Sequence, residues 1–144
     1  MFTPPAVIDT NVFVGAAFNP DSSSAQIIDA IRDGRLVLVW NEQTRRETLH
    51  VLQKIPPVDE SQFTSLFDDK GHYDGPIHPQ RFQLVEDRSD RKFAAIADAT
   101  GTVVVSNDSD LLEVRDELDI VVRSPSKFIT HSGVFDEDID AVDN

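Results

Sequence analysis

The chain has 144 residues, enough for one domain with a buried core, and its contents of 40% hydrophobic and 27% charged residues are those of an ordinary globular protein. It contains no cysteine, which excludes disulfides, thiolate metal ligands and cysteine nucleophiles. No apolar run approaches the roughly 20 residues that span a bilayer, and the N-terminus lacks a secretory signal pattern. We therefore expect a cytoplasmic protein with no membrane partner.

The formal net charge of −13 is unusual for a protein that grips nucleic acid through charge, because such proteins are usually basic. Five of the acids lie in residues 134–144, which contain no base. We expect residues 1–133 to form the folded domain and 134–144 to form an acidic, disordered tail. Acids gathered around divalent ions would account for part of the remaining charge, because bound ions neutralise them.

Apolar runs alternate with segments of helical spacing along the chain. In chain order, strands are expected at 6–9, 36–40, 82–85, 102–106 and 120–122, and helices are expected to begin near residues 22, 41, 59, 89, 110 and 125. Glycine or proline follows several of the expected helices and ends them, as Gly34 and Gly101 do. The alternation predicts an α/β fold, with a central, mostly parallel sheet of about five strands and helices on both faces.

An acid stands directly after the first expected strand, in the segment Asp9-Thr10-Asn11. A carboxylate at the end of a buried strand is costly to remove from water unless a cation or a donor meets it. Asp9 therefore either caps the following helix or holds a metal ion. Ligand sites in open parallel sheets form at the carboxyl ends of the strands, which is where Asp9 lies.

Four more acids are expected at the same edge of the sheet. Glu47 lies two turns into the helix after the second strand, Asp90 opens the helix before 102–106, and Asp108 and Asp110 follow that strand. Each alone has a simpler interpretation, as a helix cap or a solvated helix acid. Together they would repel one another strongly without a cation, and ligands that are all oxygens select Mg²⁺ or Mn²⁺. Their joint placement favours a metal site.

Four segments, in the same order as in the family, resemble the PIN domain, and within it the VapC-like toxins of toxin–antitoxin systems. The segments are 7–13, 46–52, 87–97 and 104–112, and the similarity extends over about residues 5–130. The resemblance implies a PIN-like α/β/α sandwich. It also identifies the catalytic and metal-binding acids as Asp9, Glu47, Asp90 and Asp108, adds Asp110 as a further metal ligand, and gives Thr10, Asn11 and Ser106 supporting places.

Two positions depart from the family pattern. Arg88 and Ser89 precede Asp90 where relatives often have proline and another acid, which leaves Asp87 as a rival for the role of Asp90. Asn107 stands where relatives commonly have a small or basic residue.

The resemblance implies a metal-dependent endoribonuclease that cleaves single-stranded RNA by a metal-activated water, with Mg²⁺ or Mn²⁺ as the cofactor. In-line attack by water would leave 5′-phosphate and 3′-hydroxyl ends. The resemblance further implies a toxin held inactive by a cognate antitoxin protein, and a homodimer. Basic residues beside two of the acids either contact RNA phosphates or balance neighbouring acids, namely Arg45, Arg46, Arg91 and Lys92.

Two other functions remain open from the sequence. A receiver-like regulatory domain also binds magnesium at strand ends, but it normally has paired acids after its first strand and a lysine after its fifth. Here the first strand is followed by one acid, and Lys127 lies inside the last expected helix. A PIN fold that has lost catalysis and serves protein binding is the other alternative, and the intact acids argue against it.

Overall fold

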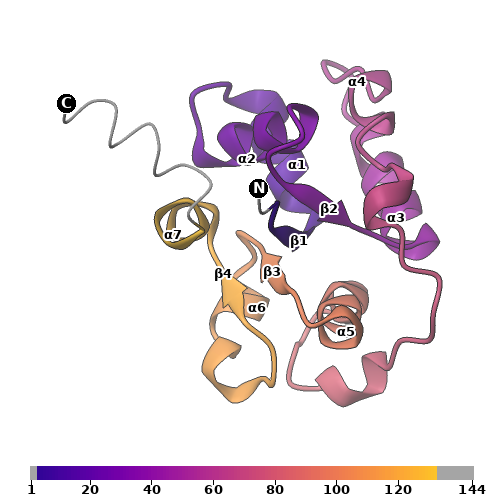
Figure 1. Ribbon diagram of the computed structural model, residues 1–144, viewed down its shortest axis with the longest axis vertical. Helices are drawn as coiled ribbons and strands as arrows, with labels where there is room; N and C mark the ends of the chain where they lie inside the picture. Colours follow the sequence, from indigo (N-terminus) through magenta and orange to yellow (C-terminus); the bar gives the residue numbers. More distant parts are fainter. Residues whose placement is uncertain (1–2, 133–144) are drawn as a thin grey trace.

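Four short apolar runs pair side by side, in parallel, at the centre of the molecule (Figure 1). In the computed structural model, which describes residues 3–132, they are β1 (Pro5–Ile8), β2 (Val37–Val39), β3 (Val103–Val105) and β4 (Val122–Arg123), in the spatial order β2-β1-β3-β4. The central strand β1 places Val7 between Val39 and Val104. Near-continuous Val, Ile and Leu suit this sheet, because its inner strands are buried on both faces.

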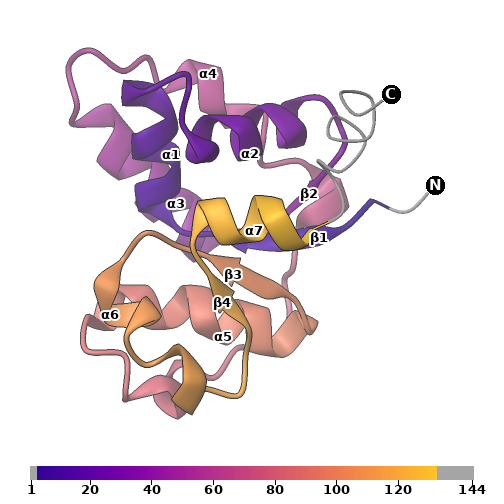
Figure 2. The same cartoon turned by 90° about the vertical axis from the view of Figure 1, so that its left-hand side faces the viewer.

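Helices cover both faces of the sheet (Figure 2). The α-helices are α1 (Thr10–Phe18), α2 (Ser23–Arg32), α3 (Glu42–Gln53), α4 (Ser61–Thr64), α5 (Arg91–Thr100), α6 (Ser109–Leu112) and α7 (Pro125–His131). Short 3₁₀ turns are η1 (Asp69–Gly71), η2 (Pro79–Phe82), η3 (Arg88–Asp90) and η4 (Arg115–Glu117). One face carries α1, α2 and α7, the other carries α5, and α3 packs against both α1 and α5. The predicted α/β architecture with a parallel sheet is confirmed.

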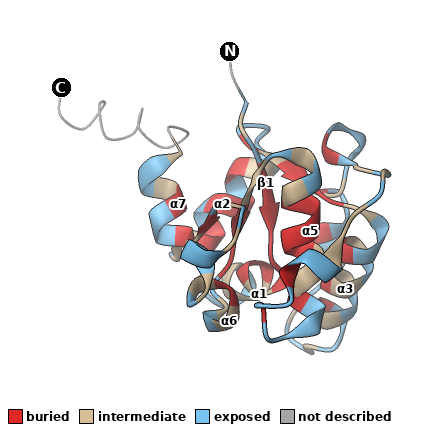
Figure 3. Ribbon diagram, turned by 90° about the horizontal axis from the view of Figure 1, so that it is seen from below, coloured by how far each residue is buried: buried red, intermediate tan, exposed pale blue. Residues whose placement is uncertain are grey.

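The hydrophobic core has two parts, one on each face of the sheet. Successive strand residues point to opposite faces, so Ala6 and Ile8 pack into one part and Val7 into the other. In the first part, the Phe13 ring of α1 stacks on Phe67 with a centroid distance of 5.7 Å. The second part is built largely by α5, whose buried side contacts β1 and β3 (Figure 3). Burial on both faces holds the ends of the strands in fixed positions.

The polar residues at the helix ends explain most of the helix boundaries. The Ser22 hydroxyl accepts a hydrogen bond from the Ala25 N–H at the start of α2, and Asn41 and Thr44 form a reciprocal capping box at the start of α3. The α5 helix ends at Gly101, which has the left-handed φ of 66° that glycine adopts without a steric penalty. These boundaries agree with the sequence predictions.

The predicted strand at 82–85 is wrong. This segment is the end of η2 followed by a turn, so the sheet in residues 3–132 has four strands and the count of about five is not confirmed. Phe82 and Val85 are three residues apart and both are buried in the same part of the core. A spacing of three suits a 3₁₀ turn, whereas in a strand it would send the two side chains to opposite faces.

Two further predictions differ from the structure or lie outside it. The helix expected to begin near residue 110 divides into two short elements, α6 and η4. The expected acidic tail, 134–144, lies outside the described residues. No helix in the described part of the chain is both long and apolar enough to cross a bilayer.

Replacing Gly71 by alanine should lower the free energy of unfolding by more than about 2 kcal/mol, because the added carbon cannot be accommodated. A Cβ at Gly71 would lie 1.6 Å from the carbonyl oxygen of Leu38 in β2. The matched control is Gly101→Ala, which meets open space at a left-handed φ and should lower the free energy by only about 1 kcal/mol. Urea denaturation measures both, and equal losses would contradict this explanation.

Candidate metal centre

The site lies where the connections of the sheet change direction. The chain passes from β1 to β2 on one side and then returns to form β3 on the other side of β1, so the switch point lies between β1 and β3. Asp9 follows β1 and Ser106 follows β3, and both lie at the carboxyl ends of these strands. The Asp9 N–H donates to the Val105 carbonyl at 2.9 Å, which extends the pairing to the edge of the sheet.

Asp9 is buried, with 2% of its surface exposed, and its carboxylate is held from the side of β3. The Ser106 hydroxyl donates a hydrogen bond of 2.6 Å to Oδ2 of Asp9 and accepts one of 2.9 Å from the Asp108 N–H. Although Asp9 occupies the N-cap position of α1, its side chain makes no capping hydrogen bond in the described structure. Of the two interpretations that the sequence left open, helix capping by the Asp9 side chain is therefore ruled out.

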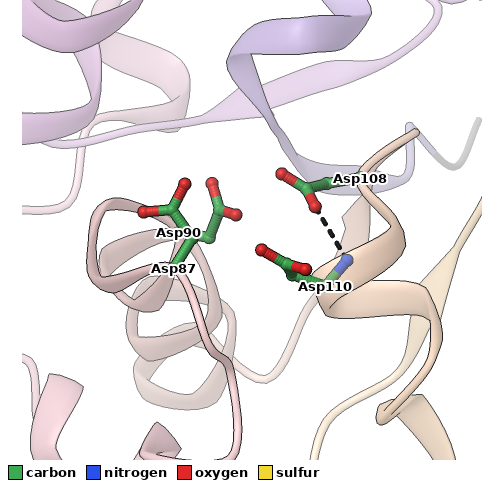
Figure 4. Close-up of side chains that lie close together, drawn as sticks. All are labelled: Asp87, Asp90, Asp108 and Asp110. Carbon is green, nitrogen blue, oxygen red and sulfur yellow. Dashed lines mark hydrogen bonds between the residues drawn. The ribbon is translucent and has the colours of Figure 1, made fainter.

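Four carboxylates converge from the two sides of this edge (Figure 4). Asp87 and Asp90 come from η3 at the start of α5, and Asp108 and Asp110 come from the start of α6. One oxygen from each lies within 4.8 Å of the others. Asp108 accepts a hydrogen bond of 2.8 Å from the Asp110 N–H, and this bond caps α6 while leaving its other oxygen directed at the cluster.

Asp90 and Asp87 differ in their surroundings although they come from one turn. Asp87 is exposed, and its Oδ1 accepts hydrogen bonds from the N–H and the hydroxyl of Ser89, at 3.0 and 2.8 Å. Asp90 is only 5% exposed, and its Oδ2 is the one buried side-chain polar atom without a hydrogen-bond partner in residues 3–132. The sequence left the two as rivals; the structure brings both to the cluster, with Asp90 inside and Asp87 at its rim.

The surroundings of the acids shift their pKa values. Burial, supplemented by the charges of Asp108 and Glu47, raises the pKa of Asp9 from 3.8 to about 6, against the opposing hydrogen bond from Ser106. Burial also raises the pKa of Asp90 far above the usual range, and the neighbouring carboxyls of Asp108 and Asp9 add to this shift. By contrast, the hydrogen bonds from Ser89 lower the pKa of Asp87. Without a cation, the buried carboxylates are therefore held in an environment that disfavours their charge.

Glu47 stands apart from the four converging acids. On α3, its Oε1 forms an ion pair of 2.5 Å with Nζ of Lys92 on α5, and its Oε2 accepts a long hydrogen bond of 3.4 Å from the Thr10 hydroxyl. Thr10 also shares a hydrogen bond of 2.8 Å with Thr48. Sequence reasoning did not select Thr48, because a buried threonine inside a helix carries no pattern that marks it as a neighbour of β1.

The two asparagines of the site fix the loop after β3. Asn11 Oδ1 accepts a hydrogen bond of 3.1 Å from the Asn107 N–H, and the Asn107 amide donates to Ser24 Oγ at 3.3 Å. These contacts connect the loop to α1 and α2, so Asn107 has a structural role at the position where it departs from the family pattern.

The four basic residues that the sequence proposed for RNA binding are not equally available. Arg91 is tied to the carbonyls of Val85 and Gln83, and Lys92 is paired with Glu47. Arg45 lies 3.5 Å from Glu42, and Arg46 is exposed. Arg45 and Arg46 also line a groove of about 660 Å³ that includes Glu47.

Comparison with known proteins identifies the family. The family model of the PIN domain matches residues 5–110. This range is well over half of the chain and contains all five predicted site acids. The chain belongs to the PIN domain family. PIN domains are generally nucleases that use divalent metals. A similar protein is an uncharacterized protein of Methanocaldococcus jannaschii, 26% identical over 136 residues, with 85% of this chain and 88% of the relative covered. No solved structure gives a significant match.

The acid cluster of this PIN domain is chemically suited to a divalent cation. Its donors are carboxylate oxygens from four side chains, the hard ligands that Mg²⁺ and Mn²⁺ prefer. The unpartnered Oδ2 of buried Asp90 supplies an acceptor for which the described protein has no donor. Burial raises the pKa values of Asp9 and Asp90 and neighbouring carboxylates add to the shifts; a cation would oppose both effects by favouring the charged carboxylates.

In EDTA, the Asp9→Asn variant should be more stable than the wild-type PIN domain. The difference between their free energies of unfolding should grow as the pH rises from 4 to 7. The folded pKa of Asp9, about 6, exceeds the value of 3.8 expected when it is unfolded, so folding binds a proton between these values and stability is lost as pH rises through them. Asparagine does not titrate, so its stability does not depend on pH in this way. By pH 7 the wild type should have lost about 3 kcal/mol relative to Asp9→Asn, the value that corresponds to the pKa shift of Asp9. Urea denaturation at each pH measures it.

The control for this prediction is Asp59→Asn, because hydrogen bonds from Ser61 lower rather than raise the pKa of that exposed acid. Its stability relative to wild type should not increase with pH. Parallel stability curves for wild type and Asp9→Asn would show that burial of Asp9 does not oppose its ionisation.

Millimolar Mn²⁺ should raise the melting temperature of the wild-type protein by about 5 °C or more, because the ion binds only the folded arrangement of acids. Asp90→Asn should melt higher than wild type in EDTA, since it removes a carboxyl group whose ionisation burial opposes, and should gain much less from Mn²⁺. Asp119→Asn, an exposed acid outside the cluster, should behave like wild type. Thermal melts with and without Mn²⁺ test this, and an equal gain in all three proteins would contradict a site at Asp90.

Proposed function

We propose that the protein is a metal-dependent endoribonuclease that cleaves single-stranded RNA, with Mg²⁺ or Mn²⁺ as its cofactor. The observation that carries the proposal is the buried Asp90, whose Oδ2 has no partner in the described residues and whose carboxylate meets those of Asp87, Asp108 and Asp110 at the switch point of a PIN fold. An acid with only a structural role, such as a helix cap, would have a backbone or side-chain donor at this oxygen.

In the proposed site, Asp90, Asp108 and Asp110 hold the ion, with Asp87 at the rim and Asp9 beneath them. A bound divalent ion supplies a more acidic water and polarises the scissile phosphate. Ser106 orients Asp9 by donating to its Oδ2, and the same hydroxyl fixes the backbone of Asp108. The residues thus present their oxygens in one preorganised arrangement, which reduces the rearrangement needed when the substrate binds.

The RNA strand needs cationic contacts to approach so many acids. Arg45 and Arg46 line the groove beside Glu47, and we propose that they bind the phosphates that flank the cleaved one. Lys92 is closer to the acids, and the charges of Lys92 and Arg91 already help to lower the pKa of Asp87.

We further propose the role of a VapC-like toxin, active as a homodimer and neutralised by a cognate antitoxin. The support is membership of the PIN family and the small size of the domain. Expression of the protein should arrest growth, and Asp90→Asn should not. Growth without arrest, together with RNA cleavage in vitro, would retain the nuclease and overturn the toxin role.

The alternatives have less support. A receiver-like domain would need a lysine that follows its last strand and reaches its acids, yet Lys127, which follows β4, lines a separate cavity with Arg123 and His131. A PIN fold that has lost catalysis would have no need to keep Asp90 unpartnered in a buried position. Acetyl phosphate should therefore leave the protein unlabelled.

Asp9→Asn and Asp90→Asn should each reduce cleavage of single-stranded RNA in Mn²⁺ by at least about 100-fold, since each removes a charge at the centre of the acid arrangement. The measurement is cleavage of an end-labelled RNA, with the products tested for 5′-phosphate ends. Circular dichroism shows whether each variant remains folded.

Two matched variants make this result interpretable. Asp119→Asn, an exposed acid outside the cluster, should retain wild-type activity, and Asp87→Asn should lose much less activity than Asp90→Asn. The opposite ranking of these last two would transfer the central role to Asp87. Full activity in Asp9→Asn or in Asp90→Asn would overturn the proposed site.

A further inference from the structure

The ion pair between Lys92 and Glu47 differs from the other ion pairs of the described chain. It joins α3 to α5 over 2.5 Å, and the two side chains are only 20% and 23% exposed. Each of the other pairs found in residues 3–132 has at least one side chain more than half exposed. Exposed pairs contribute little, whereas a shielded pair at this distance keeps both partners in place.

Both carboxylate oxygens of Glu47 are engaged by protein donors. Lys92 Nζ forms an ion pair with Oε1, and the Thr10 hydroxyl donates to Oε2 over 3.4 Å. Neither Glu47 nor Asp9 belongs to the group of four carboxylates whose oxygens lie within 4.8 Å of one another. Glu47 is therefore directed at an ammonium group, although it stands at a position where the family is expected to have a metal-binding acid.

Lys92 also lies at the helix end that carries the acid cluster. It stands two positions after Asp90, in the first turn of α5, so its ammonium and the cluster share this end of the helix. The neighbouring cation, Arg91, donates its guanidinium hydrogen bonds to the carbonyls of Val85 and Gln83. Of these two basic residues, Lys92 is therefore the one that is paired with a carboxylate, that of Glu47. A divalent ion bound to Glu47 would have to sit beside this ammonium and would be repelled by it.

We propose that Lys92 is a built-in second cation of the site. Its ammonium occupies the Glu47 side, where a second divalent ion would otherwise bind, so the protein holds one divalent ion, at Asp90, Asp108 and Asp110. Glu47 is then a positioning residue that holds Lys92, and not a metal ligand. This inference rests on the proposed metal-dependent function and specifies the number of ions.

A purely structural pair would connect α3 to α5 and have no effect on metal binding. The two roles are distinguished by counting bound ions, because loss of a structural connection changes the melting temperature and leaves the ion count unchanged. A double variant that removes both members of the pair separates the loss of the ammonium from the release of Glu47.

The experiment titrates the full chain with Mn²⁺ and follows the free ion by electron paramagnetic resonance, which counts the bound ions. We expect one ion in wild type and one in Lys92→Arg, which keeps the charge. Lys92→Met removes the charge but keeps most of the apolar stem, and it should bind a second ion through the released Glu47. In Lys92→Met combined with Glu47→Gln the count should return to one, with an affinity within about 3-fold of wild type.

Three results would overturn the proposal. Two ions in wild type, or a single ion in Lys92→Met, would show that the ammonium does not replace a metal ion. A loss of affinity of 10-fold or more in the double variant would show that Glu47 is a ligand of the first ion. These outcomes leave the metal-dependent function intact, whereas the absence of Mn²⁺ binding in every variant would overturn that function together with this inference.

Discussion

Repulsion among carboxylates is the constraint around which the rest of the structure is arranged. Two like charges 4 Å apart repel by about 4 kcal/mol at an effective dielectric constant of 20, and four carboxylates here have oxygens within 4.8 Å of one another. A domain of this size is stabilised by only about 5–15 kcal/mol in total. Such a cluster persists only if other interactions fix its members and if protons or cations reduce its charge. Burial is the main cause of the raised pKa values of Asp9 and Asp90, and the neighbouring carboxylates add to both shifts.

The backbone and the hydrophobic core of the fold hold these carboxylates in place. Burial on both faces holds β1 and β3 in register, and Asp9 and Ser106 follow directly from these strands. The Ser106 hydroxyl then connects the buried carboxylate of Asp9 to the backbone of Asp108, so two acids from distant parts of the sequence share one anchor. On the opposite side, the ion pair of Lys92 with Glu47 places a positive charge beside the acids without placing it among them.

The sequence was sufficient for the features that depend on local composition, and insufficient for those that depend on tertiary partners. Continuous apolar runs predicted all four strands, and capping residues such as Asn41 predicted the starts of α2 and α3, whereas α1 was not among the predicted helices. At 82–85 the apolar content was read as a strand, although the burial of Phe82 and Val85 follows the spacing of a tight turn. The partner of Glu47 was also beyond the sequence, because Lys92 lies 45 positions away and only the packing of α3 against α5 brings them together.

The uncapped start of α1 has a consequence for how an anion reaches this acidic molecule. This helix begins at the acid edge, with Asp9 at its N-cap position, and the Asp9 side chain makes no capping hydrogen bond in the structure as described. The aligned peptide dipoles of α1 therefore place partial positive charge at the end that faces the site. A phosphate group that arrives there meets a local potential set by the backbone, which no substitution of a surface residue would remove.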